Sequence, residues 1–229
     1  MNILSSQPPA SLTLTALSGI PLLNPGDNLV LIILQSLKQS NLSLENGDIL
    51  VIAQKVVSKA EGRYARLADI IPSERAFKLA EITGKDPRLV ELILSESREI
   101  VRHSKRTIQS SGVVVAENRQ GIVLANAGID SSNVGSESED EKVLLLPIDP
   151  DKSAGNINKE LQLKFKVRLA VIINDSLGRA WRNGTTGTAL GVSGIPALLN
   201  LRGRPDLFGK PLRVSEEAIA DELSSLSLI

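Results

Sequence analysis

The sequence contains no cysteine and a single histidine, His103, among its 229 residues. A disulfide framework, a zinc site built from His and Cys, an iron–sulfur cluster and a thiol nucleophile are therefore excluded. A Ser-His-Asp triad is disfavoured as well, because His103 lies near the predicted end of a helix, where a cation is favourable, and we expect it to have no catalytic role. Any metal ion that the chain binds must be a hard cation with oxygen ligands.

Aromatic residues and an excess of either charge are also lacking. Phe, Trp and Tyr make up 2% of the sequence, and 26 basic residues balance 26 acidic ones, so that the formal net charge is 0. The chain thus has neither the basic surface that attracts a polyanion nor the aromatic rings on which bases stack. We expect no nucleic-acid partner.

Long apolar segments are missing too. The longest apolar run, Leu29–Leu34, is far shorter than the roughly 20 residues that a membrane-spanning helix needs. No basic stretch precedes an apolar segment at the N-terminus, so no signal peptide is predicted. We expect a cytoplasmic protein without a membrane partner, in which residues 1–229 form a single unit with two lobes.

The pattern of apolar residues predicts a mixed fold of the α/β class (α+β). Aliphatic runs that favour strands alternate with amphipathic segments, which is not the pattern of a helical bundle or a β-sandwich. A polar, glycine-containing segment at 117–121 separates two of these runs and predicts an antiparallel hairpin. The predicted strands are Leu12–Leu17, Ile49–Val57, Val113–Ala116, Ile122–Asn126, Val143–Pro147, Leu169–Ile173 and Ala189–Val192.

Capping residues predict four helices. Asp86 offers a cap acceptor before Pro87, whose missing N–H costs nothing at the first helical position, and apolar residues then recur as far as about His103. Residues 131–141 are rich in Ser, Glu and Asp and predict an exposed loop. The other three predicted helices are one from Ser73 to Gly84, one over Leu29–Lys38 capped by Asp27, and a last one opened by Ser215-Glu216-Glu217.

The segment Asn126–Asn133 is the first candidate for chemistry. It follows a predicted strand, and its small residues would let the backbone approach a ligand while Asp130 presents a carboxylate from a loop. A plain Gly-Asp turn followed by a solvated loop explains the same residues. This segment alone therefore decides nothing.

A denser candidate follows the predicted strand Leu169–Ile173. Asp175 and Ser176 would stand at the carboxyl end of that strand, which suits a hard divalent cation. Arg179, Arg182 and repeated glycines offer guanidinium and backbone N–H groups to phosphate oxygens. The alternative is a turn capped by Asp175 with two surface arginines, but the number of glycines favours phosphate chemistry.

Familiar nucleotide-binding loops are not found. The segment Arg202–Pro211 has five residues between Gly203 and Gly209, and proline follows Lys210 where Ser or Thr would hold Mg²⁺, so it is not a P-loop. No G-x-G-x-x-G motif follows a predicted strand, so a Rossmann fold is not indicated. Lys55 and Lys59 lie at the end of an apolar strand, where they could bind a polyphosphate or only be solvated.

Taken together, five segments in the same order resemble the coenzyme F420-0:L-glutamate ligase (γ-glutamyl ligase) family over nearly the whole chain. The resemblance implies a two-lobed α/β fold unlike kinases or ATP-grasp ligases, and a homodimer with intertwined elements. It also implies a last segment that closes the active site, which we expect this chain to lack. The segments are Ile20–Leu23 before Pro25-Gly26-Asp27, Lys55–Gly62, Asn126–Asn133, Asp175–Gly187 and Arg202–Gly209.

The resemblance further implies a GTP- and metal-dependent ligase that adds L-glutamate to F420-0 and then extends the chain by γ-linkages. GTP is the implied co-substrate, Mg²⁺ or Mn²⁺ the implied metal, and K⁺ an additional cation. The implied metal ligands are Asp130, Asp175 and Ser176. The implied nucleotide contacts are Ile20, Pro21, Leu22, Leu23, Gln54, Lys59 and Asn133.

These residues suit carboxylate activation by phosphoryl transfer followed by attack of an amine. Asp130 and Asp175 would hold the metal, while Lys59 with Arg179 or Arg182 would add fixed positive charge. Two alternatives stay open. One is a metal-dependent phosphohydrolase, although no Asp-x-Asp pair is present, and the other is a non-catalytic or weakly active relative that binds nucleotide and metal.

Overall fold

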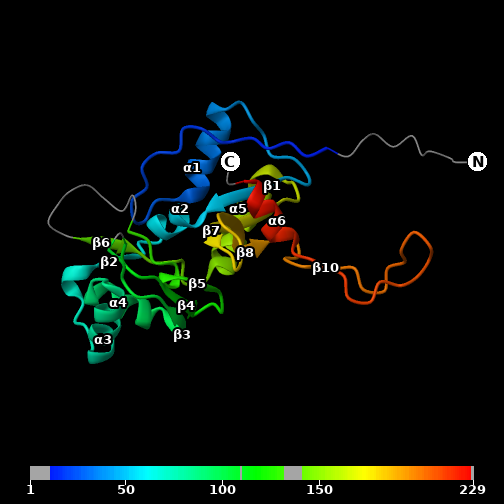
Figure 1. The fold of residues 1–229 in the computed structure, drawn as a ribbon. Coiled ribbons are helices and arrows are strands. Elements are labelled where there is room, and N and C mark those ends of the chain that lie inside the picture. The colour runs from blue at the N-terminus through cyan, green and yellow to red at the C-terminus, as the bar shows by residue number, and fades with distance from the viewer. Residues whose placement is uncertain (1–10, 109, 132–140, 228–229) are drawn as a thin grey trace, which may run out of the picture.

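The computed structural model describes residues 11–108, 110–131 and 141–227. A three-stranded sheet lies at the centre of Figure 1 and consists of β1 (Ile49–Ala53), β7 (Ala170–Gly178) and β8 (Thr185–Ser193). β1 pairs with β7 in parallel, and β7 pairs with β8 antiparallel. A mixed sheet of this kind leaves the carboxyl ends of β1 and β7 at the same edge.

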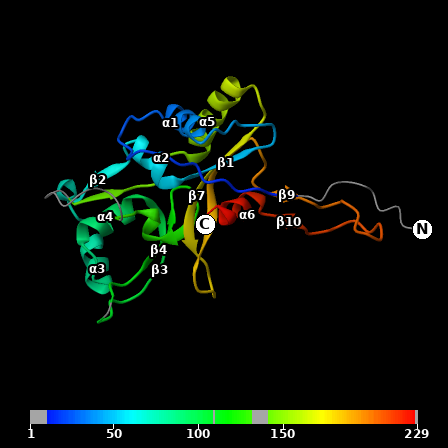
Figure 2. The same ribbon diagram turned by 90° about the horizontal axis from the view of Figure 1, so that it is seen from above.

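Helices cover both faces of this sheet. α1 (Leu29–Gln39) and α5 (Pro150–Phe165) share one buried apolar cluster with Val171 and Ile173 of β7. Residues of a strand alternate between faces, so Asn174 lies on the other face, where its amide donates to the Ser224 carbonyl of α6 (Ile219–Leu226) at 3.3 Å. Figure 2 shows the sheet between these helices.

A glycine lets α6 lie directly on the sheet. A Cβ added to Gly187 of β8 would collide with the backbone of Ser224 and Ser225. The hydroxyl of Ser225 donates to the Gly187 carbonyl at 3.0 Å. Only glycine permits this approach, so the position of the last helix depends on residue 187.

A second group of elements has its own core. α3 (Glu74–Thr83) and α4 (Pro87–Ser95) pack on a sheet of β3 (Ser97–His103), β4 (Val114–Asn118) and β5 (Val123–Ala125). β2 (Tyr64–Arg66) and β6 (Lys142–Leu144) pair antiparallel beside it. No helix within the described ranges is long and apolar enough to cross a membrane.

The mixed α/β class, the hairpin of β4 and β5, and the helix from Ser73 to Gly84 are confirmed. The helix expected from Pro87 to His103 is wrong in its second half, because it ends at Ser95 and the chain continues as β3. His103 is therefore at a strand end. Pairing with β4 outweighs the helical spacing of the apolar residues, since it satisfies the backbone groups of a whole strand.

Several expected boundaries also need correction. Leu12–Leu17 forms no strand, and the strand expected over Ile49–Val57 ends at Ala53, where α2 (Gln54–Ala60) begins. Asn28 rather than Asp27 caps α1, and Asp27 instead accepts from the Asn24 N–H. Ser215 opens no helix, since β10 (Glu216–Glu217) follows it and α6 begins at Ile219. Helix α5 was not predicted at all.

Asp86 gives a test of the capping argument. Its carboxylate accepts from the Arg88 N–H at 2.8 Å and pairs with the Arg88 guanidinium. We expect Asp86→Ala to lower the free energy of unfolding at neutral pH by about 1 kcal/mol, measured by urea denaturation. Asp86→Asn keeps a cap acceptor and should lower the free energy of unfolding by less than Asp86→Ala does.

The same carboxylate predicts a pH dependence. The hydrogen bond from Arg88 lowers the pKa of Asp86 below its ordinary value. A carboxyl group whose pKa is lower in the folded state stabilises the fold above the unfolded pKa of about 4 and loses this effect as the pH falls. The stability difference between the wild type and Asp86→Ala should therefore shrink in acid, and a constant difference would contradict this assignment.

Candidate active site

The register of two parallel strands places the first polar groups of the site. Ala53, the last residue of β1, pairs with Asn174 of β7. The next residue of β7 is Asp175, and the residues after Ala53 are the first turn of α2, which contains Lys55. The carboxyl ends of both strands thus bring Lys55 and Asp175 to the same edge of the sheet.

Asp130 reaches this edge from another part of the chain. Its backbone exchanges two hydrogen bonds with Leu144, of 3.0 and 2.8 Å. Its carboxylate Oδ2 lies 2.5 Å from the Lys55 Nζ. The side chains of Lys55 and Asp130 are 35% and 24% exposed, so this ion pair is less screened than one on the open surface.

The charges at this edge act on one another. Burial is the largest influence on Asp175 and raises its pKa above the ordinary value. The Ser176 N–H, which donates to the Asp175 carboxylate at 2.8 Å, opposes this rise. The negative charge of Asp130 raises the pKa of Asp175 further, and the positive charge of Lys55 lowers it. Two carboxylates and one ammonium group therefore form a single electrostatic unit.

The turn that carries Asp130 has an unusual backbone. Asn126, Ala127 and Gly128 have φ angles of 52°, 53° and 79°, so three consecutive residues are in the left-handed region. For Ala127 this conformation is strained, whereas Asn adopts it more readily than other residues with a side chain. The Oδ1 atom of Asn126 is buried and has no hydrogen-bond partner in the structure as described. Strain and an unpaired acceptor occur together only a few residues before Asp130.

Strand β7 is longer than its sequence predicts. It continues past Ile173 through Asp175 and Ser176 to Gly178, because β8 pairs with it along this length. Asp175 and Ser176, expected just after the end of a strand that stops at Ile173, are therefore part of the strand itself. Arg179 and Arg182 lie in the exposed turn that joins β7 to β8.

The remaining predicted nucleotide contacts have different surroundings. Gln54 is buried, and its side chain accepts from the Ser58 hydroxyl at 3.0 Å. Lys59 lies in the last turn of α2. The segment from Ile20, Pro21 and Leu22 to Leu23 has an irregular conformation before α1, with Leu22 exposed. Asn133 lies outside the described residues.

Lys55 was not among the predicted site residues. The sequence pattern places Lys55 and Lys59 together at a strand end, and only Lys59 was expected in the site. The signal that could have separated them is position, because Lys55 directly follows a strand that pairs with the strand of Asp175. Lys59 lies one turn further along α2. The ion pair with Asp130 depends on a third segment, which no local pattern indicates.

A hard divalent cation fits the chemistry of this edge. Asp130 and Asp175 offer carboxylate oxygens, and Ser176, the next residue of β7, carries a hydroxyl. Within the ranges that the structure describes, no group of three or more His, Cys, Asp or Glu side chains could hold a metal ion. Mg²⁺ is commonly bound by one or two carboxylates together with water and substrate phosphates. The two carboxylates meet that requirement when water and a phosphate ligand complete the shell.

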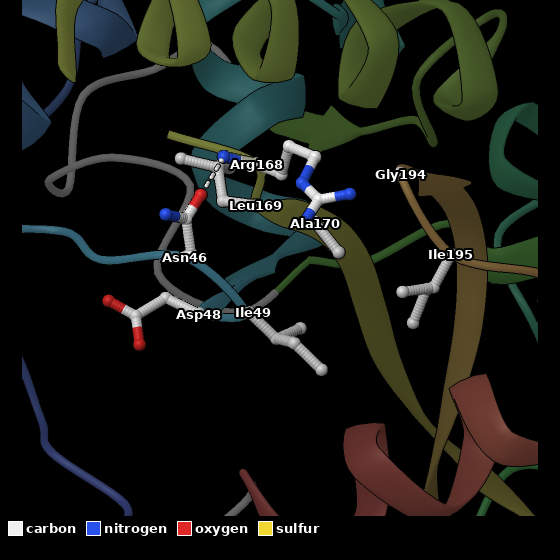
Figure 3. A pocket seen from close by; sticks show the side chains of 9 residues that line it. Asn46, Asp48, Ile49, Arg168, Leu169, Ala170, Gly194 and Ile195 are labelled. Carbon is white, nitrogen blue, oxygen red and sulfur yellow. Dashed lines mark hydrogen bonds between the residues drawn. The ribbon is translucent and has the colours of Figure 1, made fainter. Parts of the chain in front are cut away.

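A separate pocket lies at the opposite end of the same two strands. Its volume is about 410 Å³, and Figure 3 shows Asn46 and Asp48 before β1 and Arg168 before β7 at its walls. The Arg168 N–H donates to the Asn46 side chain at 2.8 Å. Because Asp175 lies in the carboxyl-terminal half of β7 and the pocket is lined by residues at the amino end of that strand, this pocket is not part of the site formed by Lys55, Asp130 and Asp175.

Comparison with known proteins gives one consistent result. The family described as F420-0:Gamma-glutamyl ligase matches residues 19–229. A protein of Methanothermobacter thermautotrophicus named Coenzyme F420:L-glutamate ligase is 44% identical over 93% of this chain and 81% of its own length. Proteins of the same name from Methanocaldococcus jannaschii and Archaeoglobus fulgidus are 45% and 38% identical, over 80% and 91% of this chain and 70% and 78% of their own lengths.

Gly128 provides a test of how the Asp130 turn is supported. A Cβ added there would lie 2.5 Å from Leu146 Cδ1, in addition to the positive φ. We expect Gly128→Ala to lower the free energy of unfolding by about 3 kcal/mol, measured by urea denaturation. Gly121→Ala is the matched control, because Gly121 also has a positive φ but faces only the side-chain ends of Arg98, at 3.3 Å, and Glu117, at 4.0 Å. Gly121→Ala should lower the free energy of unfolding by about 1 kcal/mol. Equal losses in the two variants would contradict the role given to Leu146.

Proposed function

The chain belongs to the F420-0:gamma-glutamyl ligase family, and we propose that it joins L-glutamate to coenzyme F420-0 with GTP as co-substrate. Relatives named Coenzyme F420:L-glutamate ligase cover most of the chain and support this activity. The observation that carries the proposal is the convergence of Asp130, Asp175 and Lys55 at one strand edge. Such an edge is where α/β proteins commonly bind their ligands.

In this proposal a divalent cation, Mg²⁺ or Mn²⁺, would be held by Asp130, Asp175 and Ser176. When bound, such an ion neutralises negative charge on phosphate oxygens. The Lys55 ammonium group is the fixed cation that the chain itself provides beside them. Lys59 and the turn with Arg179 and Arg182 would add positive charge for the nucleotide. K⁺ would be an additional cation.

The proposed reaction activates a carboxylate. The terminal carboxylate of the acceptor attacks the γ-phosphorus of GTP, and the bond from that phosphorus to the bridging oxygen breaks, which gives an acyl phosphate and GDP. The amino group of L-glutamate then attacks the acyl carbon and inorganic phosphate leaves, so that an amide forms. No side-chain nucleophile is needed, which agrees with a chain that has no cysteine. Positioning and electrostatic stabilisation carry catalysis of this kind.

A direct assay tests the proposed activity. The protein is incubated with F420-0, L-glutamate, GTP and either MgCl₂ or MnCl₂, and the products are analysed by mass spectrometry. We expect F420 species heavier by whole glutamyl residues, together with one GDP for each amide formed. ATP in place of GTP should give less product. Nucleotide binding without any glutamyl addition would instead favour the non-catalytic relative.

Asp175 is the residue on which the metal proposal depends most. We expect Asp175→Asn to reduce ligase turnover by at least about 100-fold, because one carboxylate ligand and its charge are lost. Asp48→Asn is the matched control, since Asp48 lies at the amino end of the neighbouring strand β1 and should keep full activity. Circular dichroism of both variants checks the fold. Unchanged turnover in Asp175→Asn would reject the site.

We also propose that the protein is a cytoplasmic homodimer of two-lobed subunits. The segment from β9 (Leu199–Asn200) to β10 projects from the rest of the molecule in Figures 1 and 2. Its apolar side chains Leu207 and Phe208 are 99% and 89% exposed. Large exposed apolar side chains on a projecting segment are typical of a surface that a partner covers.

Light scattering tests the dimer. We expect the wild type to have twice the mass of one chain at micromolar concentration, and the double variant Leu207→Ser with Phe208→Ser to shift toward the monomer. Removing two buried apolar side chains from an interface should weaken association by more than about tenfold. Leu163→Ser on the exposed face of α5 is the control and should stay dimeric. A wild-type monomer would refute the proposal.

A further inference from the structure

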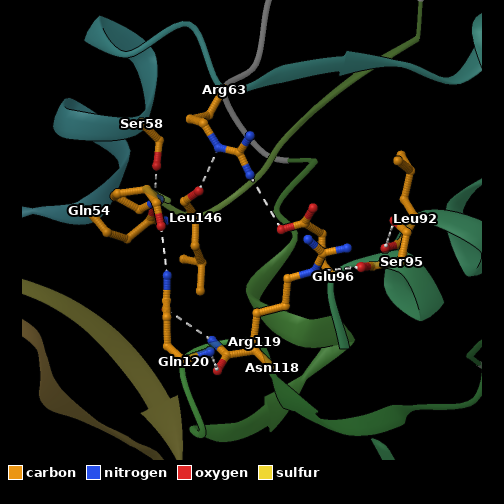
Figure 4. A network of polar contacts seen from close by, with 11 residues as sticks. Gln54, Ser58, Arg63, Leu92, Ser95, Glu96, Asn118, Arg119, Gln120 and Leu146 are labelled. Carbon is orange, nitrogen blue, oxygen red and sulfur yellow. Dashed lines mark hydrogen bonds and ion pairs between the residues drawn. The ribbon is translucent and has the colours of Figure 1, made fainter. Parts of the chain in front are cut away.

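Arg63 lies between α2 and β2 and contacts three separate segments. Its guanidinium Nε donates to the Leu146 carbonyl at 2.9 Å, and its Nη2 lies 3.3 Å from a carboxylate oxygen of Glu96 at the end of α4. Its backbone N–H donates to the Ser58 carbonyl of α2, and its carbonyl accepts from the Leu145 N–H. Figure 4 shows the guanidinium between the Leu146 carbonyl and the Glu96 carboxylate.

The segment held by Arg63 is the one that supports Asp130. Leu144 exchanges two backbone hydrogen bonds with Asp130, and the Leu146 side chain packs against Gly128 so closely that no Cβ fits there. Residues 144–146 therefore contact the turn before Asp130 at one point and Asp130 itself at another. A displacement of this segment would move the carboxylate.

The other side of Arg63 leads to Lys55. Arg63 follows α2, the helix whose first turn carries Lys55, and its N–H is bonded to that helix at Ser58. The same residue is thus anchored to the element of the ammonium group and to the support of the carboxylate. The side chains of Arg63 and Glu96 are only 20% and 24% exposed, so the pair is partly shielded from water and its geometry is constrained.

We propose that Arg63 is a positioning residue that sets the Asp130 carboxylate at its distance from Lys55 and Asp175. It acts through the Leu146 carbonyl and touches no reacting atom. Glu96 orients the guanidinium and compensates its charge. The metal and activity readouts below depend on the proposed function, but the placement of Asp130 does not.

The backbone contacts of Arg63 do not require its side chain. The ladder of β2 with β6, in which Tyr64 pairs with Leu144, stays possible in any variant at residue 63. We therefore expect Arg63→Gln to fold, with the Leu146 carbonyl losing its charged donor. Arg63→Lys keeps a charged donor but lacks the planar guanidinium, so its properties should lie between those of the wild type and those of Arg63→Gln.

Hydrogen exchange tests the placement without any ligand. We expect the amides of Asp130 and Leu144 to exchange at least about tenfold faster in Arg63→Gln than in the wild type, and those of β7 to be unchanged. Arg119→Gln is the matched control, because Arg119 donates to the Ser95 carbonyl at the end of α4 but not to residues 144–146. Unchanged exchange at Asp130 and Leu144 in Arg63→Gln would overturn the proposal, whatever the protein catalyses.

Mn²⁺ affinity tests the consequence for the site. Groups that orient metal ligands typically contribute 10–100-fold to affinity. We expect Arg63→Gln to weaken Mn²⁺ binding in the presence of GTP by at least about tenfold, measured by electron paramagnetic resonance, with partial recovery in Arg63→Lys and no change in Arg119→Gln. Once Asp130→Asn is present, the Arg63 substitution should have no further effect. Additive losses would show that Arg63 does not act through Asp130 and would overturn the proposal.

Ligase kinetics separate positioning from a general loss of stability. We expect Arg63→Gln to lower kcat while the KM for L-glutamate stays within about twofold, because the effect is confined to the carboxylate. A wild type that neither binds Mn²⁺ nor adds glutamate would reject the proposed function alone, and the exchange experiment would then decide the role of Arg63.

Discussion

Two carboxylates that lie close together and partly out of water must be compensated, and this requirement explains how the site of this protein is built. Lys55 compensates Asp130 through a direct ion pair, and the Ser176 N–H opposes the rise in the pKa of Asp175. Lys55 comes from a different segment than Asp130, whereas the N–H that serves Asp175 belongs to the backbone of the next residue in the same strand. The parallel register of β1 with β7 and the backbone pairing of Asp130 with Leu144 are what bring them together.

The support of the site is distributed over both groups of elements. The sheet of β1 and β7 fixes Lys55 and Asp175, whereas Asp130 depends on a strained turn and on residues 144–146. Arg63 joins these two parts through α2 on one side and Leu146 on the other. In this arrangement the guanidinium is more than a surface charge, because it bonds the Leu146 carbonyl, two residues from the Leu144 backbone that pairs with Asp130.

The sequence predicts local features well and the meeting of distant segments poorly. Ser73 and Gly84 bound their helix because capping acts within one turn of chain. The second half of the helix expected to reach His103 is instead strand β3, since β4 supplies hydrogen bonds that no local pattern indicates. Asp130 and Asp175 were candidates from their positions after predicted strands and from the family resemblance, but the ion pair of Asp130 with Lys55 depends on tertiary structure. The expectation for Asn133 stays a prediction, because it lies outside the described residues.

The pairing of β1 with β7 also has a consequence for how the molecule forms. Its partners, Ile49–Ala53 and Ala170–Asn174, are separated by most of the elements of the second group. Closing so long a loop costs entropy before any contact repays it, and pairings of this kind form slowly. During synthesis β1 must wait for β7 to leave the ribosome before its parallel partner exists. The carboxylate edge is therefore among the last parts of the molecule to become complete, and a ligand that binds there selects only fully folded chains.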